Sequence, residues 1–288
     1  MLYSASQVGA WALTCAVVAR SFECVDYTCS KIFRYRFADR DPSFWLSCPL
    51  DMLVLYAIIV HMSQQLHTAM TTILAMPYFQ NQAHKSGGAD FAHERAVAEH
   101  IRACGFAELD RSSYPKVTKS LLKKWAEGRG DADLRKATQG MPEGTFISQP
   151  AGSQGFPDIL VRDWGDRYVA VECKSGKNGQ CPMWNDNTPK PLTIYVLSSG
   201  VQNATTIFMG QDVITPQQQD LMDQLERDLT AIVNKYKILV DAEDQFNRGW
   251  IQKARKQHFQ AGGGAKTNYF IHKERAICEQ RALDYSRS

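Results

Sequence analysis

Two β-rich runs separated by a glycine turn constrain the fold of this 288-residue chain more than any other feature. Residues 158–164 and 167–175 are rich in strand-forming side chains, and the Gly-Asp pair at 165–166 is typical of a hairpin turn. Two further short strands are expected at 193–199 and 205–209. The pattern predicts a block of consecutive strands in the middle of the chain.

Helical patterns lie on both sides of these strands. Residues 89–104 carry apolar side chains at helical spacing, and residues 116–136 indicate helix and loop. A long helix is expected over 216–236, a basic helix over 241–260 and a last strand over 268–272. The long helix has an apolar stripe formed by Leu221, Leu225, Leu229, Ile232 and Tyr236. This order predicts an α/β or α+β fold with a central mixed sheet flanked by helices.

Residues 1–75 differ in character from residues 76–288, which we expect to form the catalytic domain. Two apolar runs near the N-terminus are shorter than the roughly 18 to 20 residues that cross a bilayer, and the first residues lack the basic region of a signal peptide. Three interpretations are open: a helical accessory domain, a membrane-associating arm, or sequence upstream of a start at Met70 or Met76. The first and last are favoured, so we expect no stable membrane association.

Charge and cysteine content exclude few classes of function. The formal net charge is +3, but basic residues dominate between Arg248 and Arg281. Lys253, Arg255 and Lys256 in this region are candidate contacts to a phosphate backbone, although a solvated helix face is the commoner meaning of such a run. The eight cysteines include no Cys-x-x-Cys pair, which argues against a zinc site and favours free thiols in a reducing cytoplasm.

Three side chains around the hairpin carry the chemistry that phosphodiester hydrolysis needs. Asp158 precedes the first strand, and Glu172 and Lys174 project from one face of the second, because strand side chains alternate. Mg²⁺ prefers oxygen ligands and needs only one or two carboxylates, and a neighbouring lysine can orient or activate the attacking water. The alternative is an ordinary strand start at Asp158 and a solvent-facing pair at Glu172 and Lys174.

The hairpin register decides whether these three groups converge. A two-residue loop would set Asp158 opposite Cys173 and turn the groups to different faces. A three-residue loop or a bulge would set Asp158 opposite Lys174, with Glu172 on the same face. We therefore predict an odd loop, a bulge or a strand bend before Ile159.

The segment Gly155-Phe156-Pro157-Asp158, followed by a strand, a turn and Val171-Glu172-Cys173-Lys174, resembles the PD-(D/E)xK nuclease superfamily, and type II restriction endonucleases in particular. The resemblance extends over roughly residues 89–215. It implies a restriction-endonuclease-like core in which Asp158 and Glu172 bind Mg²⁺ and Lys174 acts on the water. An upstream helix glutamate of some members corresponds to Glu94 or Glu99, and spacing does not choose between them. Supporting roles are expected for Gln154 and Asn185.

The function implied by this resemblance is Mg²⁺-dependent, sequence-specific cleavage of double-stranded DNA by a cytoplasmic restriction enzyme acting as a homodimer. Two alternatives are open. One is a non-specific, repair or junction-resolving nuclease with the same fold. The other is a DNA-binding protein without catalytic activity. The recognition sequence, the cut position and a companion methyltransferase are not readable from the sequence.

Overall fold

The structure is a computed structural model, and it describes residues 64–78, 89–153, 155–176, 181–182, 184, 188–245, 260 and 267–287. The chain divides into two compact units, residues 1–59 and residues 60–288, and every described residue belongs to the second unit. Within these residues, no helix is both long enough and apolar enough to cross a membrane.

The second unit combines helices on both sides of a block of strands, as the sequence predicts. In chain order its described elements are α4 (Gln65–Leu74), α5 (Ala89–Ala103), β1 (Ala107–Glu108), η2 (Arg111–Ser113), α6 (Lys119–Ala126), α7 (Asp131–Ala137), β2 (Thr145–Ser148), β3 (Ile159–Asp163), β4 (Arg167–Gly176), β5 (Thr193–Ser199), β6 (Ala204–Met209), η3 (Gly210–Asp212), α8 (Pro216–Ala242) and α9 (Arg275–Arg287). The expected central strands and the expected helices at 89–104 and 216–236 are therefore confirmed.

The strands form one mixed sheet of six strands in the order β1-β2-β3-β4-β5-β6. Strands β2, β3 and β4 form an antiparallel meander, and β5 and β6 are also antiparallel to each other. Strand β5 runs parallel to β4, and β1 runs parallel to β2. The molecule is thus a mixed α/β protein with helices flanking a central sheet, in agreement with the coarse expectation.

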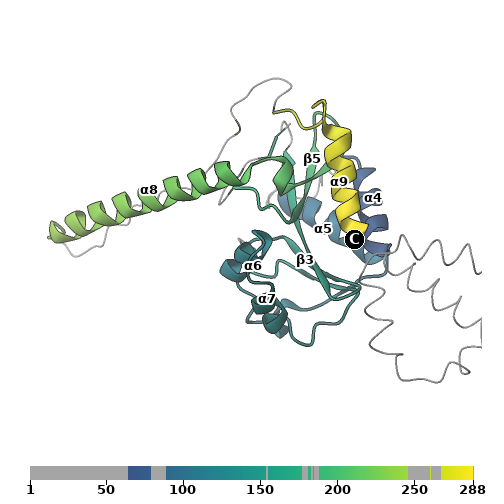
Figure 1. The fold of residues 1–288 in the computed structure, drawn as a ribbon, viewed down its shortest axis with the longest axis horizontal. Helices are drawn as coiled ribbons and strands as arrows, with labels where there is room; N and C mark the ends of the chain where they lie inside the picture. The colour runs from purple at the N-terminus through teal and green to yellow at the C-terminus, as the bar shows by residue number, and fades with distance from the viewer. Residues whose placement is uncertain are drawn as a thin grey trace, which may run out of the picture. The chain divides into compact units, whose positions relative to one another are not determined.

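Helices cover both faces of the sheet (Figure 1). Helices α4, α5 and α9 pack over one face, on alternate strand residues such as Val161, Val171 and Val196. Helices α6 and α7 pack over the other face, on residues such as Leu160 and Ala170. Both faces of β3 and β4 are therefore buried, which explains why these strands are almost continuously hydrophobic rather than alternating with polar residues.

The hairpin between β3 and β4 has the odd loop that the sequence analysis predicts, but its register differs from the expected one. Asp163 pairs with Arg167, so residues 164–166 form the connection, and Gly165 and Asp166 both have positive φ, at 76° and 60°. Ile159 pairs with Val171. One step outward, this register places Asp158 opposite Glu172 and not opposite Lys174, because the loop closes one pair earlier than expected. The conclusion that the three groups share a face is unaffected.

The expected last strand at 268–272 is wrong. These residues form turns, in which the Asn268 side-chain oxygen accepts a 3.0 Å hydrogen bond from the N–H of Phe270. Phe270 is buried, and Tyr269 packs on Phe208 of β6 with ring centroids 4.6 Å apart. The aromatic side chains that resemble a strand pattern are instead anchors for the turn that leads into α9, a helix that the sequence analysis does not anticipate.

Helix α4 lies inside the residue range expected for the N-terminal extension, 1–75, yet it is part of the sheet unit. Its side chains Leu66, Ala69, Met70 and Ile73 are each 0% exposed. It packs against α5, α9 and β6. The contacts thus place residues 65–74 with the sheet rather than with the preceding residues.

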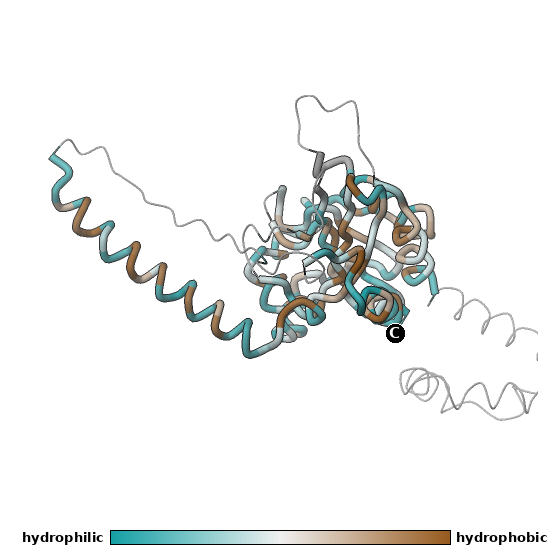
Figure 2. Tube along the Cα trace, turned by 90° about the horizontal axis from the view of Figure 1, so that it is seen from above, coloured by the Kyte–Doolittle hydropathy of each residue, from teal (hydrophilic) through white to brown (hydrophobic). Residues whose placement is uncertain are grey.

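Helix α8 has 27 residues and extends away from the sheet (Figures 1 and 2). Its start is well defined, because Thr215 and Gln218 form a capping box and Pro216 occupies the first turn. Gln219 near the start is buried and hydrogen-bonds to Thr188. The apolar stripe expected from the sequence is present on this helix, but its side chains are exposed. The basic helix expected at 241–260 falls almost entirely outside the described residues.

Candidate functional site

The candidate site lies where β3 begins and β4 ends. Asp158 immediately precedes β3, and its carbonyl accepts a 2.6 Å hydrogen bond from the N–H of Gln149 at the end of β2. Gln149 has a positive φ of 47°, so the chain leaves β2 through a sharp local turn. The loop that follows therefore returns directly to Asp158, and the position of Asp158 is held from two strands.

Asp158 is joined to β4 by two hydrogen bonds across the hairpin, one to Glu172 and one to Cys173. The N–H of Asp158 donates to Oε2 of Glu172 at 3.2 Å. The N–H of Cys173 donates to Oδ2 of Asp158 at 2.7 Å. These two contacts bring the two carboxyl groups to neighbouring strand ends, as the candidate site requires.

Lys174, two residues after Glu172 on β4, is the third member of the site. Its Nζ lies 2.7 Å from Oε1 of Glu172, and the two side chains are 22% and 12% exposed. Burial by itself would lower the pKa of Lys174, but the charges of Glu172 and Asp158 outweigh burial and raise this pKa. Lys174 therefore carries a positive charge beside the two carboxyl groups at neutral pH. The structure thus brings together all three of the residues predicted to be catalytic.

The electrostatics of Asp158 show an excess of negative charge at this point. Burial, followed by the charges of Glu172 and Glu94, raises the pKa of Asp158 to about 8. The thiol pKa of Cys173, which is buried in the core, is raised well above its usual value by burial and by the charges of Asp158, Glu94 and Glu172. Lys174 offsets only part of the repulsion, so a further cation would be stabilised here.

Glu94 of α5, and not Glu99, belongs to this group. Its charge acts on Asp158, and its Oε2 accepts a 3.0 Å hydrogen bond from Nε2 of Gln149. Glu99 is exposed on the same helix and pairs with Arg102. Spacing along α5 does not distinguish the two glutamates. Their positions in the folded structure do, because only Glu94 lies beside the site. Gln149, which was not singled out from the sequence, links Glu94 to Asp158.

A divalent cation fits this group of residues by its chemistry. Among the described residues, no cluster of three or more His, Cys, Asp or Glu side chains has the arrangement of a preformed metal site. Mg²⁺, however, retains water and binds through one or two carboxylates plus substrate oxygens. Asp158 and Glu172 supply two such carboxylates, and burial together with the neighbouring charges of Glu172 and Glu94 raises the pKa of Asp158, an effect that a bound cation would oppose.

Several expected site residues lie outside the described residues: Gln154, Asn185, Lys253, Arg255 and Lys256. Trp184, their neighbour in sequence, is buried and packs edge-on against Tyr195 with ring centroids 5.1 Å apart. It therefore contributes to the core rather than to an open site. All the described cysteines, at positions 104, 173, 181 and 278, are free thiols, as expected.

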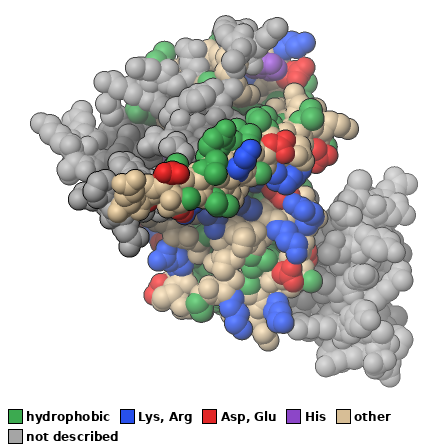
Figure 3. Space-filling model, turned by 90° about the vertical axis from the view of Figure 1, so that its left-hand side faces the viewer, with side chains coloured by type: hydrophobic (Ala, Val, Ile, Leu, Met, Phe, Trp, Pro, Cys, Tyr) green, Lys and Arg blue, Asp and Glu red, His purple; other side chains and the backbone are tan. Residues whose placement is uncertain are grey.

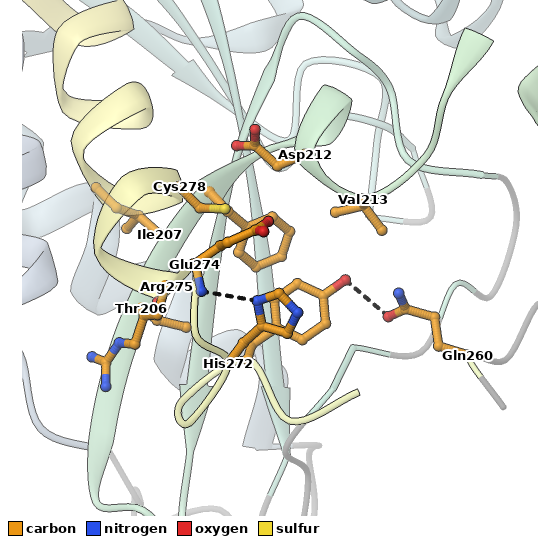
Figure 4. Close-up of a pocket in the computed structure, with 11 residues that line it drawn as sticks. Thr206, Ile207, Asp212, Val213, Gln260, His272, Glu274, Arg275 and Cys278 are labelled. Atoms are coloured by element: carbon orange, nitrogen blue, oxygen red, sulfur yellow. Dashed lines mark hydrogen bonds between the residues drawn. The ribbon is translucent and has the colours of Figure 1, made fainter. Parts of the chain in front are cut away.

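A separate pocket lies between β6, η3 and the start of α9 (Figure 4). The Tyr269 hydroxyl donates to Oε1 of Gln260 at 2.9 Å, and the N–H of Glu274 donates to Nδ1 of His272 at 3.3 Å. Asp158, Glu172 and Lys174 are not among the described residues that line it. This pocket is therefore distinct from the candidate site.

Comparisons with known proteins found no relative of this chain: no family model, no curated protein and no solved structure matches it.

Proposed function

We propose that this protein is a Mg²⁺-dependent endonuclease that hydrolyses double-stranded DNA. The single observation behind the proposal is that Glu172 accepts hydrogen bonds from both the N–H of Asp158 and the Nζ of Lys174, which gathers the three residues at one point. A buried and a half-buried carboxylate beside a half-buried lysine, at the end of two paired strands, are suited to hold a cation and a phosphate together. The sequence resemblance to PD-(D/E)xK nucleases rests on the same residues.

Each residue has a definite role in this proposal. When bound by Asp158 and Glu172, Mg²⁺ supplies charge neutralisation at the phosphate and lowers the pKa of water. The ammonium group of Lys174 is held by Glu172 and orients the attacking water or offsets the phosphate charge. Glu94, held by Gln149, adds negative charge that favours a cation near Asp158. The peptide N–H groups of Asp158 and Cys173 keep the carboxyl groups in place.

We further infer that the biological activity is that of a type II restriction enzyme built on a restriction-endonuclease-like core. The antiparallel meander β2-β3-β4, with β5 parallel to β4, supports such a core, because it presents the strand ends of β3 and β4 beside α5. A symmetric DNA site is cut most simply by a two-fold dimer, so the proposed enzyme is a homodimer.

Incubation of the purified protein with unmethylated plasmid DNA and Mg²⁺ tests the proposal directly. Cleavage is expected, and it should stop on addition of a chelator and in Lys174→Ala. A protein that binds DNA but leaves it intact under all metal conditions would overturn the catalytic proposal and favour a binding protein without activity.

The pattern of cleavage separates the two kinds of nuclease. Discrete fragments with identical end sequences support the restriction enzyme. A continuous smear, or cleavage confined to branched DNA, supports a non-specific, repair or junction-resolving nuclease with the same site. Sequencing of the fragment ends would also identify the recognition sequence and the cut position.

A further inference from the structure

The apolar side of α8 is exposed along most of the helix. The exposed fractions of its large hydrophobic side chains range from 45% to 71%, for Leu221, Leu225, Leu229, Ile232, Tyr236, Ile238, Leu239 and Val240. Figure 2 shows apolar segments recurring along the helix, and in Figure 3 hydrophobic side chains gather along the helix that crosses the centre of the view. Such a continuous exposed apolar surface is characteristic of an interaction site.

The spacing of these side chains is that of a coiled coil. Apolar residues alternate at intervals of three and four along the helix: Met222, Leu225, Leu229, Ile232, Tyr236 and Leu239. These are the a and d positions of successive heptads, with a at 222, 229 and 236. A seam of this kind fits a second helix with the same spacing.

Among the described residues, the body of the protein does not present a partner for this seam. A groove separates α8 from the body, and its lining comes from Lys123, Glu127 and Lys190 on one side. The α8 side of the groove is formed mainly by polar residues, including Arg227 and Asn234. The face of α8 that is turned toward the body is thus the polar one, and the heptad seam is a different face.

We propose that α8 pairs with α8 of a second copy of this chain to form an antiparallel two-stranded coiled coil. In that arrangement Leu229 faces Ile232 of the second copy, and Leu225 faces Tyr236 of the second copy. Met222 then faces Leu239 at each end. The six a and d residues of each helix are used, and the pairing has two-fold symmetry.

Charge complementarity selects the antiparallel orientation. Asp228 and Lys235 occupy successive g positions, and g positions of the two helices face one another when the helices are antiparallel. Asp228 of one copy then lies beside Lys235 of the other, twice by symmetry. Within the described residues neither takes part in an ion pair, whereas Lys237 and Asp241 on the same helix pair with each other. A parallel pair would place these two charges beside valine side chains at the e positions and gain nothing.

Sedimentation of the full-length protein without DNA or Mg²⁺ tests the proposal. The wild type is expected to be a dimer at micromolar concentration. The double variant Leu229→Glu/Ile232→Glu should raise the dimer dissociation constant at least 100-fold. The matched control Thr230→Glu/Asn234→Glu adds the same charge to the groove face of α8 and should remain dimeric. Circular dichroism and thermal unfolding establish that each variant is folded.

A charge exchange tests the orientation. Asp228→Lys alone should weaken the dimer, because two lysines then face each other, and Asp228→Lys/Lys235→Asp should restore it. A monomeric wild type, or a dimer that survives Leu229→Glu/Ile232→Glu, would overturn the proposal, and failure of the double exchange to restore the dimer would overturn the antiparallel register. The inference does not rest on the nuclease proposal, because sedimentation requires no DNA cleavage. Lys174→Ala should be inactive and still dimeric.

Discussion

The N–H of Asp158 donates to the carboxylate of Glu172 while the carboxylate of Asp158 accepts from the N–H of the next residue along β4, at 3.2 Å and 2.7 Å. These two contacts follow from the three-residue loop, because Ile159 pairs with Val171 and Asp158 then lies opposite Glu172. They bring two acidic groups close together, where repulsion between them is strong. The charges of Glu172 and Asp158 also raise the pKa of Lys174, which keeps this half-buried side chain charged.

Removal of the lysine charge should abolish most of the activity. We expect Lys174→Ala to lower the cleavage rate by roughly 100-fold or more, which is the contribution typical of a group that moves or orients a proton. Lys136→Ala removes an exposed lysine from α7 and should leave the rate nearly unchanged. Single-turnover cleavage of plasmid DNA at saturating Mg²⁺ measures both. Equal rates for the two variants would contradict the role of Lys174.

The raised pKa of Asp158 predicts a pH dependence of stability in the absence of divalent cations. The pKa is about 8 in the folded protein, against an ordinary value of 3.8. Between these values the folded state binds the proton more tightly than the unfolded state does. The contribution of Asp158 therefore decreases the free energy of unfolding as pH rises from about 4 to about 8, by at most about 1.4 kcal/mol per pH unit.

Asp158→Asn provides the comparison for this pH effect, because the amide does not titrate. Denaturant unfolding with a chelator present, at several pH values, should give a shallower decrease for this variant than for the wild type. Added Mg²⁺ should also reduce the wild-type decrease, since a cation replaces the proton. If the free energy of unfolding decreases equally steeply with pH in Asp158→Asn and in the wild type, then Asp158 is ionised at neutral pH and the prediction is wrong.

The two glutamates of α5 should behave differently. Glu94→Gln removes a negative charge next to Asp158 and should weaken Mg²⁺ binding, so that several-fold more Mg²⁺ is needed for half-maximal cleavage. Glu99→Gln changes an exposed residue that pairs with Arg102, and surface pairs of this kind contribute little. Titration of Mg²⁺ in the cleavage assay separates them. The opposite order of effects would exclude Glu94 from the site.

Helix α4 should be essential for stability even though it precedes residue 76. Ile73→Ala should lower the free energy of unfolding by about 2 to 5 kcal/mol, because Ile73 is fully buried. Thr71→Ala lies on the exposed side of the same helix and should change it by less than about 0.5 kcal/mol. Urea denaturation measures both values. A start at Met76 would remove the helix altogether and is expected to leave the remainder unfolded or aggregated.

Local sequence patterns predicted the central strands and the longest helices because these elements are specified by short-range periodicity. The turn at Gly165 and Asp166, with the hydrophobic runs on either side, is sufficient to define the hairpin. The pattern at 268–272 failed because aromatic side chains are equally suited to a strand and to a turn that packs on a sheet. The turn is favoured only in the folded protein, where Tyr269 packs on Phe208 of β6.

The sequence alone determined the identity and strand spacing of Asp158, Glu172 and Lys174, because side-chain alternation along a strand is a local property. Only the tertiary structure decided that Asp158 faces Glu172, that Glu94 rather than Glu99 joins them, and that Gln149 connects the two elements. These relationships depend on loop closure and on the packing of α5 against the sheet. Both bring together residues far apart in the chain, and no local pattern encodes that proximity.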